Sequence, residues 1–133
     1  MKQITGINHV GIRVRNLAVT RDFYEKLGFE FIKGPVGPEP VAVMIHPCGV
    51  NMNFILNASK NADSDNVLMD RSTKQAGYTH VALEVSDLES VERQLGELEI
   101  PITGEVELPT GARFIFVRDP DRNIIEFHRP ASS

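Results

Sequence analysis

Two histidines and one glutamate have the residue types and spacing to bind a divalent metal ion. His9 belongs to the phrase Gly-Ile-Asn-His-Val, and His80 belongs to the similar phrase Gly-Tyr-Thr-His-Val in the second half of the chain. Glu126 lies in the apolar run Ile-Ile-Glu-Phe, where an unpaired carboxylate would be costly. Two imidazoles and one carboxylate suit Fe, Mn, Ni, Co or Zn. Three protein ligands leave open positions for water or substrate, so we expect one divalent transition metal ion per site.

The charge of such a site indicates what it would bind. Two neutral imidazoles and one carboxylate leave a divalent ion with a net charge near +1. An anionic substrate that offers two neighbouring oxygen atoms would therefore bind well.

The repeated phrases predict two copies of one structural unit. Residues 7–14 and 79–85 alternate between apolar and polar side chains, as half-buried strands do. Asn16 is a suitable N-cap for a helix that runs to about Leu27, and Gly28 ends it. Ser86 and Glu89 form a capping box that predicts a second helix, to about Leu98. Further strands are expected at about 29–33, 41–46, 50–57, 100–106, 112–118 and 123–128.

This pattern predicts an α+β fold of two βαβββ modules that form a cupped mixed sheet. The modules span residues 1–57 and 77–130 of a single domain, residues 1–133. The polar segment 58–76 reads as a linker with a small apolar knot at 67–69. Because each helix needs an apolar face of its sheet, the opposite face is free to line a pocket. The polar residues expected on that face are His9, Arg13, Asn51, Asn53, His80, Glu84, Glu126 and His128.

Composition excludes several classes of partner. The formal net charge is −4 and the pI is about 5.5, which gives no electrostatic reason to expect nucleic acid or an anionic membrane as a partner. Cys48 is the one cysteine, so no internal disulfide is possible and a reducing compartment is expected. No apolar run is long enough for a signal peptide or a membrane span. We therefore expect a cytoplasmic protein.

Four segments together resemble the vicinal oxygen chelate superfamily of glyoxalases, fosfomycin-resistance thiol transferases, extradiol dioxygenases and bleomycin-resistance proteins. They are Asn-His-Val-Gly-Ile from residue 8, Asp-Phe-Tyr-Glu-Lys-Leu-Gly-Phe from residue 22, Thr-His-Val-Ala from residue 79, and Arg-Asp-Pro-Asp-Arg-Asn-Ile-Ile-Glu-Phe from residue 118. The resemblance implies paired βαβββ modules around a metal, with His9, His80 and Glu126 as ligands. It also implies a homodimer.

The sequence departs from the resembled pattern at two positions. Glyoxalases of the superfamily usually carry a second carboxylate where this chain has Asn53, which argues against a typical glyoxalase activity. The turn before the last strand commonly has glycine where this chain has Arg122. We expect a right-handed turn to accommodate that arginine.

The roles of the other polar residues stay open between alternative readings. Arg13 and Glu84 are related by the same offset as His9 and His80, and they form either a salt bridge or a substrate-binding arginine with a general base. Asn53 is placed in the substrate pocket. Glu126 and Glu84 are the candidate catalytic carboxylates. His128 reads as a rim residue or hydrogen-bonding group.

Two function classes compete. The first is a metalloenzyme of the lyase, isomerase or dioxygenase type that acts on a small oxygen-rich substrate, with a fosfomycin-type thiol transferase as a variant. The second is a metal-free protein of the bleomycin-resistance type that binds a small molecule.

Overall fold

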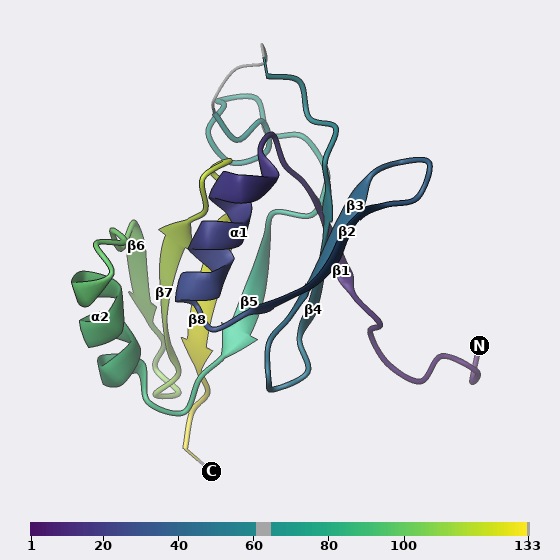
Figure 1. The fold of residues 1–133 in the computed structure, drawn as a ribbon. Coiled ribbons are helices and arrows are strands. Elements are labelled where there is room, and N and C mark those ends of the chain that lie inside the picture. The colour runs from purple at the N-terminus through teal and green to yellow at the C-terminus, as the bar shows by residue number, and fades with distance from the viewer. Residues whose placement is uncertain (61–64, 133) are drawn as a thin grey trace. The chain divides into compact units, whose positions relative to one another are not determined.

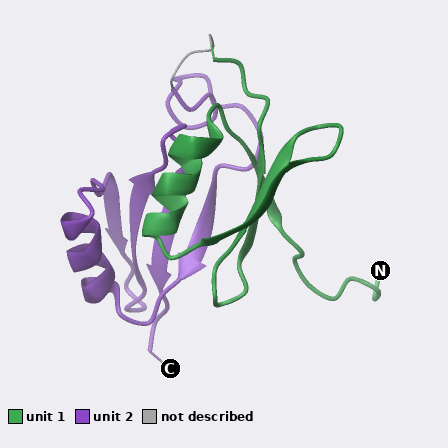
Figure 2. Cartoon of the chain, viewed as in Figure 1, with its two compact units in different colours: residues 1–63 green, residues 64–133 purple. Residues whose placement is uncertain are grey.

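The computed structural model describes residues 1–60 and 65–132 and divides the chain into two compact units, Met1–Asp63 and Ser64–Ser133 (Figure 2). Unit 1 contains β1 (Val10–Arg13), α1 (Leu17–Lys26), β2 (Glu30–Val36), β3 (Val41–Ile45) and β4 (Asn51–Ile55). Unit 2 contains β5 (His80–Glu84), α2 (Leu88–Glu97), β6 (Gly104–Glu107), β7 (Arg113–Arg118) and β8 (Ile124–Arg129). Both units have the βαβββ order (Figure 1), which confirms the predicted α+β class.

The boundary between the two units falls within the predicted linker 58–76. Residues 61–64 of that linker and residue 133 lie outside the described residues. That residues 1–133 form one domain, with modules at 1–57 and 77–130, stays a prediction.

The two sheets share one topology. Their strand orders are β1-β4-β3-β2 and β5-β8-β7-β6, with the first pair parallel and the other pairs antiparallel. A parallel neighbour requires a crossover connection, which the helix and the following strands provide in each unit. The register aligns Gly11 with Asn53 in unit 1 and Ala82 with Glu126 in unit 2. Asn53 and Glu126 therefore occupy equivalent places, as the sequence alignment of the modules predicts.

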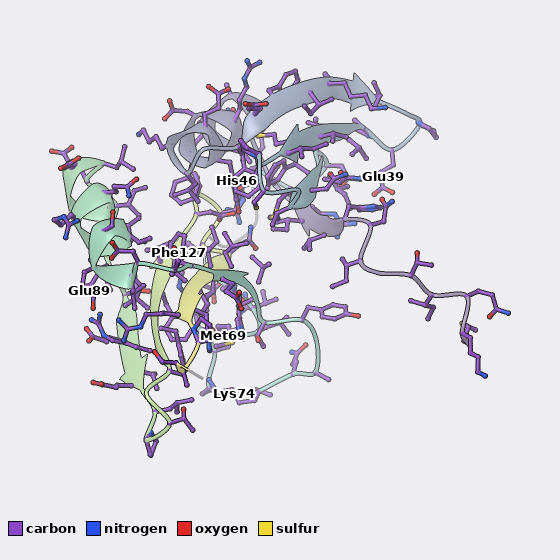
Figure 3. All side chains as sticks on the ribbon, turned by 90° about the horizontal axis from the view of Figure 1, so that it is seen from below. Glu39, His46, Met69, Lys74, Glu89 and Phe127 are labelled. Atoms are coloured by element: carbon purple, nitrogen blue, oxygen red, sulfur yellow. The ribbon has the colours of Figure 1, made fainter. Side chains whose placement is uncertain are left out.

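Each helix buries its apolar face against its own sheet. In α1, the Tyr24 ring lies 4.7 Å from Phe54 and 5.6 Å from Phe29, measured between ring centroids. In unit 2, Leu88 of α2 is fully buried, and Phe127 lies on the side of β8 that faces the helix (Figure 3). Met52 and Phe54 of β4 and Ile125 and Phe127 of β8 share the faces that lie toward these cores, so Asn53 and Glu126 project from the opposite faces.

Equivalent side chains cap the two helices. The Asn16 Oδ1 atom accepts a hydrogen bond from the Val19 amide at 3.2 Å, as predicted. In α2, Asp87 is the N-cap, and its Oδ1 atom accepts from the Ser90 amide at 3.0 Å. The prediction that Ser86 caps this helix is therefore wrong by one residue. The offset between Asn16 and Asp87 equals the offset between the two repeated phrases. The repeat therefore predicts the N-cap of α2 correctly, whereas the local capping-box pattern does not.

Left-handed backbone ends both helices and closes the last turn. Gly28 has φ of 95°, and Glu99 follows α2 with φ of 59°. Arg122 has φ of 65°, so the expectation that a right-handed turn accommodates it is wrong. Arg122 is the last residue of the tight turn from β7 to β8, in which its amide donates to the Asp119 carbonyl at 2.8 Å and the Asp119 amide donates to the Asn123 carbonyl at 2.9 Å. Left-handed conformations strain any residue with a Cβ atom.

Residues 65–70 of the linker pack on unit 2. Asp70 accepts two hydrogen bonds from the Arg118 guanidinium, at 2.8 and 3.1 Å. The Asn66 side chain donates to the Arg122 carbonyl at 3.2 Å. These contacts hold residues 65–70 against the turn between β7 and β8. Among the described residues, no helix has the length and apolar character needed to cross a membrane.

Candidate metal centre

Unit 2 brings two of the three predicted ligands together. His80 is the first residue of β5, and Glu126 lies in the middle of the neighbouring parallel strand β8. The Nε2 atom of His80 lies 3.3 Å from the Oε1 atom of Glu126. The glutamate side chain is only 9% exposed, whereas that of His80 is 38% exposed. A nearly buried carboxylate thus lies beside an imidazole that solvent can reach.

The Nδ1 atom of each predicted histidine ligand contacts a side-chain oxygen of the preceding residue. His80 Nδ1 lies 2.8 Å from Thr79 Oγ1, and His9 Nδ1 lies 2.8 Å from Asn8 Oδ1. Because an amide oxygen only accepts, the Asn8 contact places the hydrogen of His9 on Nδ1. The Nε2 atom then carries the free lone pair. Metal-ligating histidines usually have this arrangement, in which the other ring nitrogen donates a hydrogen bond. His9 itself is exposed, just before β1.

The geometry in unit 2 is compatible with a shared metal ion. Two ligands at the usual bond lengths of about 2.0–2.2 Å, with an angle between tetrahedral and octahedral values, are about 2.8–3.6 Å apart. The 3.3 Å separation of His80 Nε2 and Glu126 Oε1 matches that range. The donor set also fits, because imidazole and carboxylate are ligands for Fe, Mn, Co, Ni and Zn. Within residues 1–60 and 65–132, however, no group of three or more His, Cys, Asp or Glu side chains is gathered closely enough to hold a metal.

His128 contacts Glu126, whereas the sequence predicted a hydrogen-bonding role for His128 without naming its partner. Its Nδ1 atom lies 2.7 Å from Glu126 Oε2, and its ring stacks on Phe114 with centroids 5.0 Å apart and planes 8° apart. His80 meets Phe116 edge-on at 6.2 Å. The reading of His128 as a hydrogen-bonding group is confirmed. The two phenylalanines were missed, although their alternation on β7 places both on the face that carries Glu126.

Arg13 is engaged within unit 1. Its Nε atom donates to Asn57 Oδ1 at 2.9 Å, and its NH2 atom lies 3.7 Å from Glu39 Oε1. Asn57 also donates to Glu39 at 3.0 Å, so the three side chains form a closed cluster. Glu39 lies in the connection between β2 and β3 (Figure 3). A salt bridge from Arg13 to Glu84 stays a prediction, as does substrate binding by Arg13.

Asn53 and Glu84 lie at the positions that strand parity predicted. The Oδ1 atoms of Asn51 and Asn53 are buried and, among the described groups, have no hydrogen-bond partner. A buried acceptor without a partner is unfavourable, which favours a ligand or water as the missing donor. Glu84 is exposed at the end of β5 and borders an open depression that also includes Arg129.

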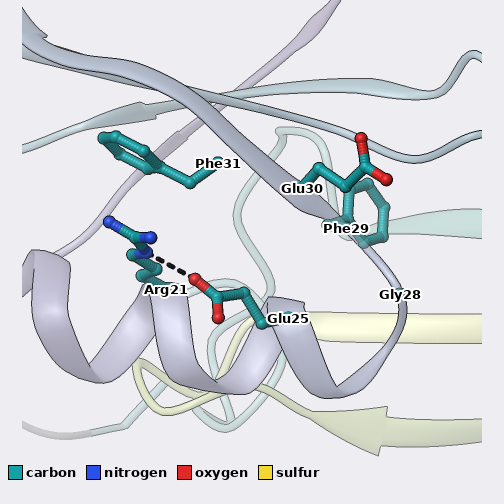
Figure 4. A pocket seen from close by; sticks show the side chains of 6 residues that line it. All are labelled: Arg21, Glu25, Gly28, Phe29, Glu30 and Phe31. Carbon is teal, nitrogen blue, oxygen red and sulfur yellow. Dashed lines mark hydrogen bonds and ion pairs between the residues drawn. The ribbon is translucent and has the colours of Figure 1, made fainter.

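A second open depression lies beside α1 in unit 1, away from the predicted site residues (Figure 4). The Arg21 guanidinium lies 4.1 Å above the Phe31 ring and is hydrogen-bonded to Glu25. Its positive charge is therefore already satisfied. The lining residues are Arg21, Glu25, Gly28, Phe29, Glu30 and Phe31.

Comparison with known proteins identifies one family. The family model described as the glyoxalase/bleomycin resistance protein/dioxygenase superfamily matches residues 6–127. No protein of curated function matches the sequence.

Several solved structures share the fold. A glyoxalase family protein from Enterococcus faecalis is 28% identical, with a TM-score of 0.73 over 92% of this chain and 96% of that one. A glyoxylase/bleomycin resistance protein/dioxygenase domain from Frankia sp. EAN1pec is 21% identical, with a TM-score of 0.75 over 96% and 93%. A variant of the fosfomycin resistance protein FosX from Listeria monocytogenes is 17% identical, with a TM-score of 0.71 over 96% and 93%. That structure contains Mn(II) and 1S,2S-dihydroxypropylphosphonic acid.

Proposed function

The chain belongs to the glyoxalase/bleomycin resistance protein/dioxygenase superfamily, and on that premise we propose that it is a divalent-metal-dependent enzyme acting on a small oxygen-rich substrate. The observation that carries the proposal is the His80–Glu126 pair, in which a nearly buried carboxylate oxygen lies 3.3 Å from an imidazole nitrogen. His9 would complete the ligand set. The Mn(II) and the diol phosphonate bound by the FosX variant support the same class of ligand here.

Residues of the chain would bind the metal and move protons around it. His9, His80 and Glu126 would hold the ion, which supplies Lewis acidity toward negative charge that develops on substrate oxygens. Glu84 lies on the same face of β5 as His80 and is exposed, so it is available to accept a substrate proton. The Asn53 amide would hydrogen-bond the substrate. Lyase, isomerase, dioxygenase and thiol-transfer reactions are all compatible with these residue roles.

The proposal also includes the oligomeric state and the cellular compartment. Superfamily resemblance favours a homodimer. Among the described residues, β1, β2, β5 and β6 are the edge strands of the two sheets, and such edges can pair with another chain. The single cysteine, Cys48, is exposed and free, which favours a reducing compartment such as the cytoplasm.

Metal content and ligand binding test the function. Protein purified without chelators is subjected to element analysis, then loaded with Mn²⁺ or Co²⁺ and titrated with oxalate, a small anion with two neighbouring oxygen donors. We expect one metal per proposed site and oxalate binding that disappears after EDTA treatment. Protein that contains no metal, takes up none, and binds oxalate equally well with EDTA would contradict the enzyme proposal and favour the metal-free binding class.

A further inference from the structure

The two oxygen atoms of Glu126 have different partners. Oε1 lies beside His80 Nε2 at 3.3 Å, and Oε2 lies 2.7 Å from His128 Nδ1. An ionised carboxylate only accepts hydrogen bonds, so Nδ1 of His128 must carry the hydrogen. A hydrogen bond to a charged group at this distance, on a side chain that is 9% exposed, is among the stronger ones in proteins.

The His128 ring is itself held in place. It is stacked nearly parallel on Phe114, its directly opposite neighbour across the β7–β8 ladder. The stack covers one face of the ring, and 32% of the side chain remains exposed. A stacked ring has few alternative orientations, and the Nδ1 atom therefore stays directed at Oε2.

Unit 1 carries different residues at the equivalent places. Glu84 pairs with His128 across the β5–β8 ladder, and Arg13 pairs with Ile55 at the corresponding place across β1–β4. Unit 1 thus has Asn53 and Ile55 where unit 2 has Glu126 and His128. The hydrogen bond belongs specifically to the unit with the carboxylate.

We propose that His128 is a positioning residue that restricts Glu126 to a single metal-binding oxygen, Oε1. The inference rests on the proposed metal site. Because Oε2 is engaged by His128, Glu126 would bind the ion through one oxygen and leave an additional coordination position open. A substrate with two neighbouring oxygens needs two such positions. His128 would therefore act on both the affinity for the metal and the number of ligands around it.

Two substitutions separate the hydrogen bond from the ring stack. His128→Phe keeps an aromatic ring on Phe114 but removes the Nδ1 donor. His128→Asn removes the ring but has an amide nitrogen close to the place of Nδ1. Wild-type protein and both variants are titrated with Co²⁺, and the affinity and the visible absorption spectrum are recorded. Thermal unfolding of the metal-free proteins verifies that each variant is folded, and His128→Leu replaces His128→Phe if the latter does not fold.

The hydrogen bond predicts opposite results for the two variants. Loss of an outer-shell partner typically lowers metal affinity about 10- to 100-fold, so we expect a loss of about that size in His128→Phe. We also expect weaker visible Co²⁺ absorption, because a freed Oε2 raises the coordination number. His128→Asn should keep the spectrum and most of the affinity.

Three results would overturn the inference. If His128→Phe matches wild type in affinity and spectrum, His128 does not position Glu126, although the proposed metal site stands. If His128→Asn loses as much affinity as His128→Phe, a donor at the place of Nδ1 does not account for the effect, and the proposed role of the hydrogen bond is wrong. If wild-type protein binds no Co²⁺, both the inference and the proposed function fail.

Discussion

Asn8 and Thr79 make the same contact with the histidine that follows each of them. In both pairs a side-chain oxygen lies 2.8 Å from the histidine Nδ1 atom. The two pairs occupy equivalent places in the repeat and belong to different units. One repeated phrase therefore supplies both an imidazole and the group that orients it. In each unit the Nδ1 atom is engaged by the preceding side chain, which leaves Nε2 as the nitrogen available to a metal ion; in unit 2 this atom lies 3.3 Å from Glu126 Oε1.

Metal binding should stabilise the fold. An ion that binds the folded chain only, at about 100 times its dissociation constant, adds about 2.7 kcal/mol to the free energy of unfolding. For a chain of this size the midpoint of thermal unfolding should rise by roughly 10 °C. Calorimetry with and without Mn²⁺ measures the shift, and Glu126→Gln should abolish it. Glu107→Gln, an exposed glutamate on β6, is the matched control and should leave it unchanged.

The two N-cap residues should contribute similar amounts to stability. Replacing Asn16 or Asp87 by alanine leaves an amide of the first helical turn without its acceptor, which typically costs about 1 kcal/mol. Ser86→Ala is the control and should cost much less, because Ser86 precedes the cap. Urea unfolding measures all three variants. A larger loss for Ser86→Ala than for Asp87→Ala would contradict the observed cap.

Glycine should relieve left-handed strain at two positions. Arg122 has φ of 65° and Glu99 has φ of 59°. Arg122→Gly and Glu99→Gly should each stabilise the fold by about 0.5–1 kcal/mol, after the extra flexibility of glycine in the unfolded chain is included. Gly28→Ala is the reverse experiment: its φ is 95°, and an added Cβ would lie 3.1 Å from His46 Nε2. That variant should be destabilised, and equal stability of all three in urea unfolding would refute the interpretation.

Acid should weaken the contact between residues 65–70 and the β7–β8 turn. The hydrogen bonds from Arg118 hold the pKa of Asp70 well below its usual value. Because the folded-state pKa is lower than the unfolded-state pKa, Asp70 contributes stability above the unfolded value of about 3.9. This contribution is lost as the pH falls below that value. Asp70→Asn should be less stable than wild type at pH 7, and the difference should shrink in acid.

Unfolding curves between pH 2 and 7 measure this dependence. Glu97→Gln, at an exposed carboxylate of α2, serves as the comparison for the loss of a carboxylate. A stability difference between wild type and Asp70→Asn that does not change with pH would contradict the role of the Asp70 carboxylate.

Much of the fold was predictable because the repeat and the strand period act at short range. Alternation along residues 79–85, together with the two-residue period of a strand at 123–128, predicts which side chains share a face. Parallel pairing of these strands then places Glu126 next to His80. The Asp87 cap was also available from the repeat, since it stands where Asn16 stands in the first module, but the local capping-box pattern favoured Ser86.

Contacts made by irregular segments were not predictable in the same way. Arg13 pairs with Glu39, which lies in the connection between two strands and follows no period. Asp70 binds Arg118 for the same reason: a loop conformation, with no alternation pattern, brings them together. The positive φ at Arg122 did have a signal in the sequence, because glycine, which commonly stands at this place in the resembled pattern, favours the left-handed conformation. Pairs of long side chains depend on loop geometry that sequence periodicity does not encode.

Stoichiometric binding of one divalent ion is the most direct test of the metal centre. Equilibrium dialysis with Mn²⁺ is carried out on wild-type protein and on His9→Ala, His80→Ala and Glu126→Gln. His46→Ala is the control, because His46 is the one histidine outside the proposed centre and its His128 neighbour. We predict one bound ion in wild type and in the control, and a large loss of affinity in each of the three variants. Undiminished Mn²⁺ binding by the His9→Ala, His80→Ala and Glu126→Gln proteins would contradict the account.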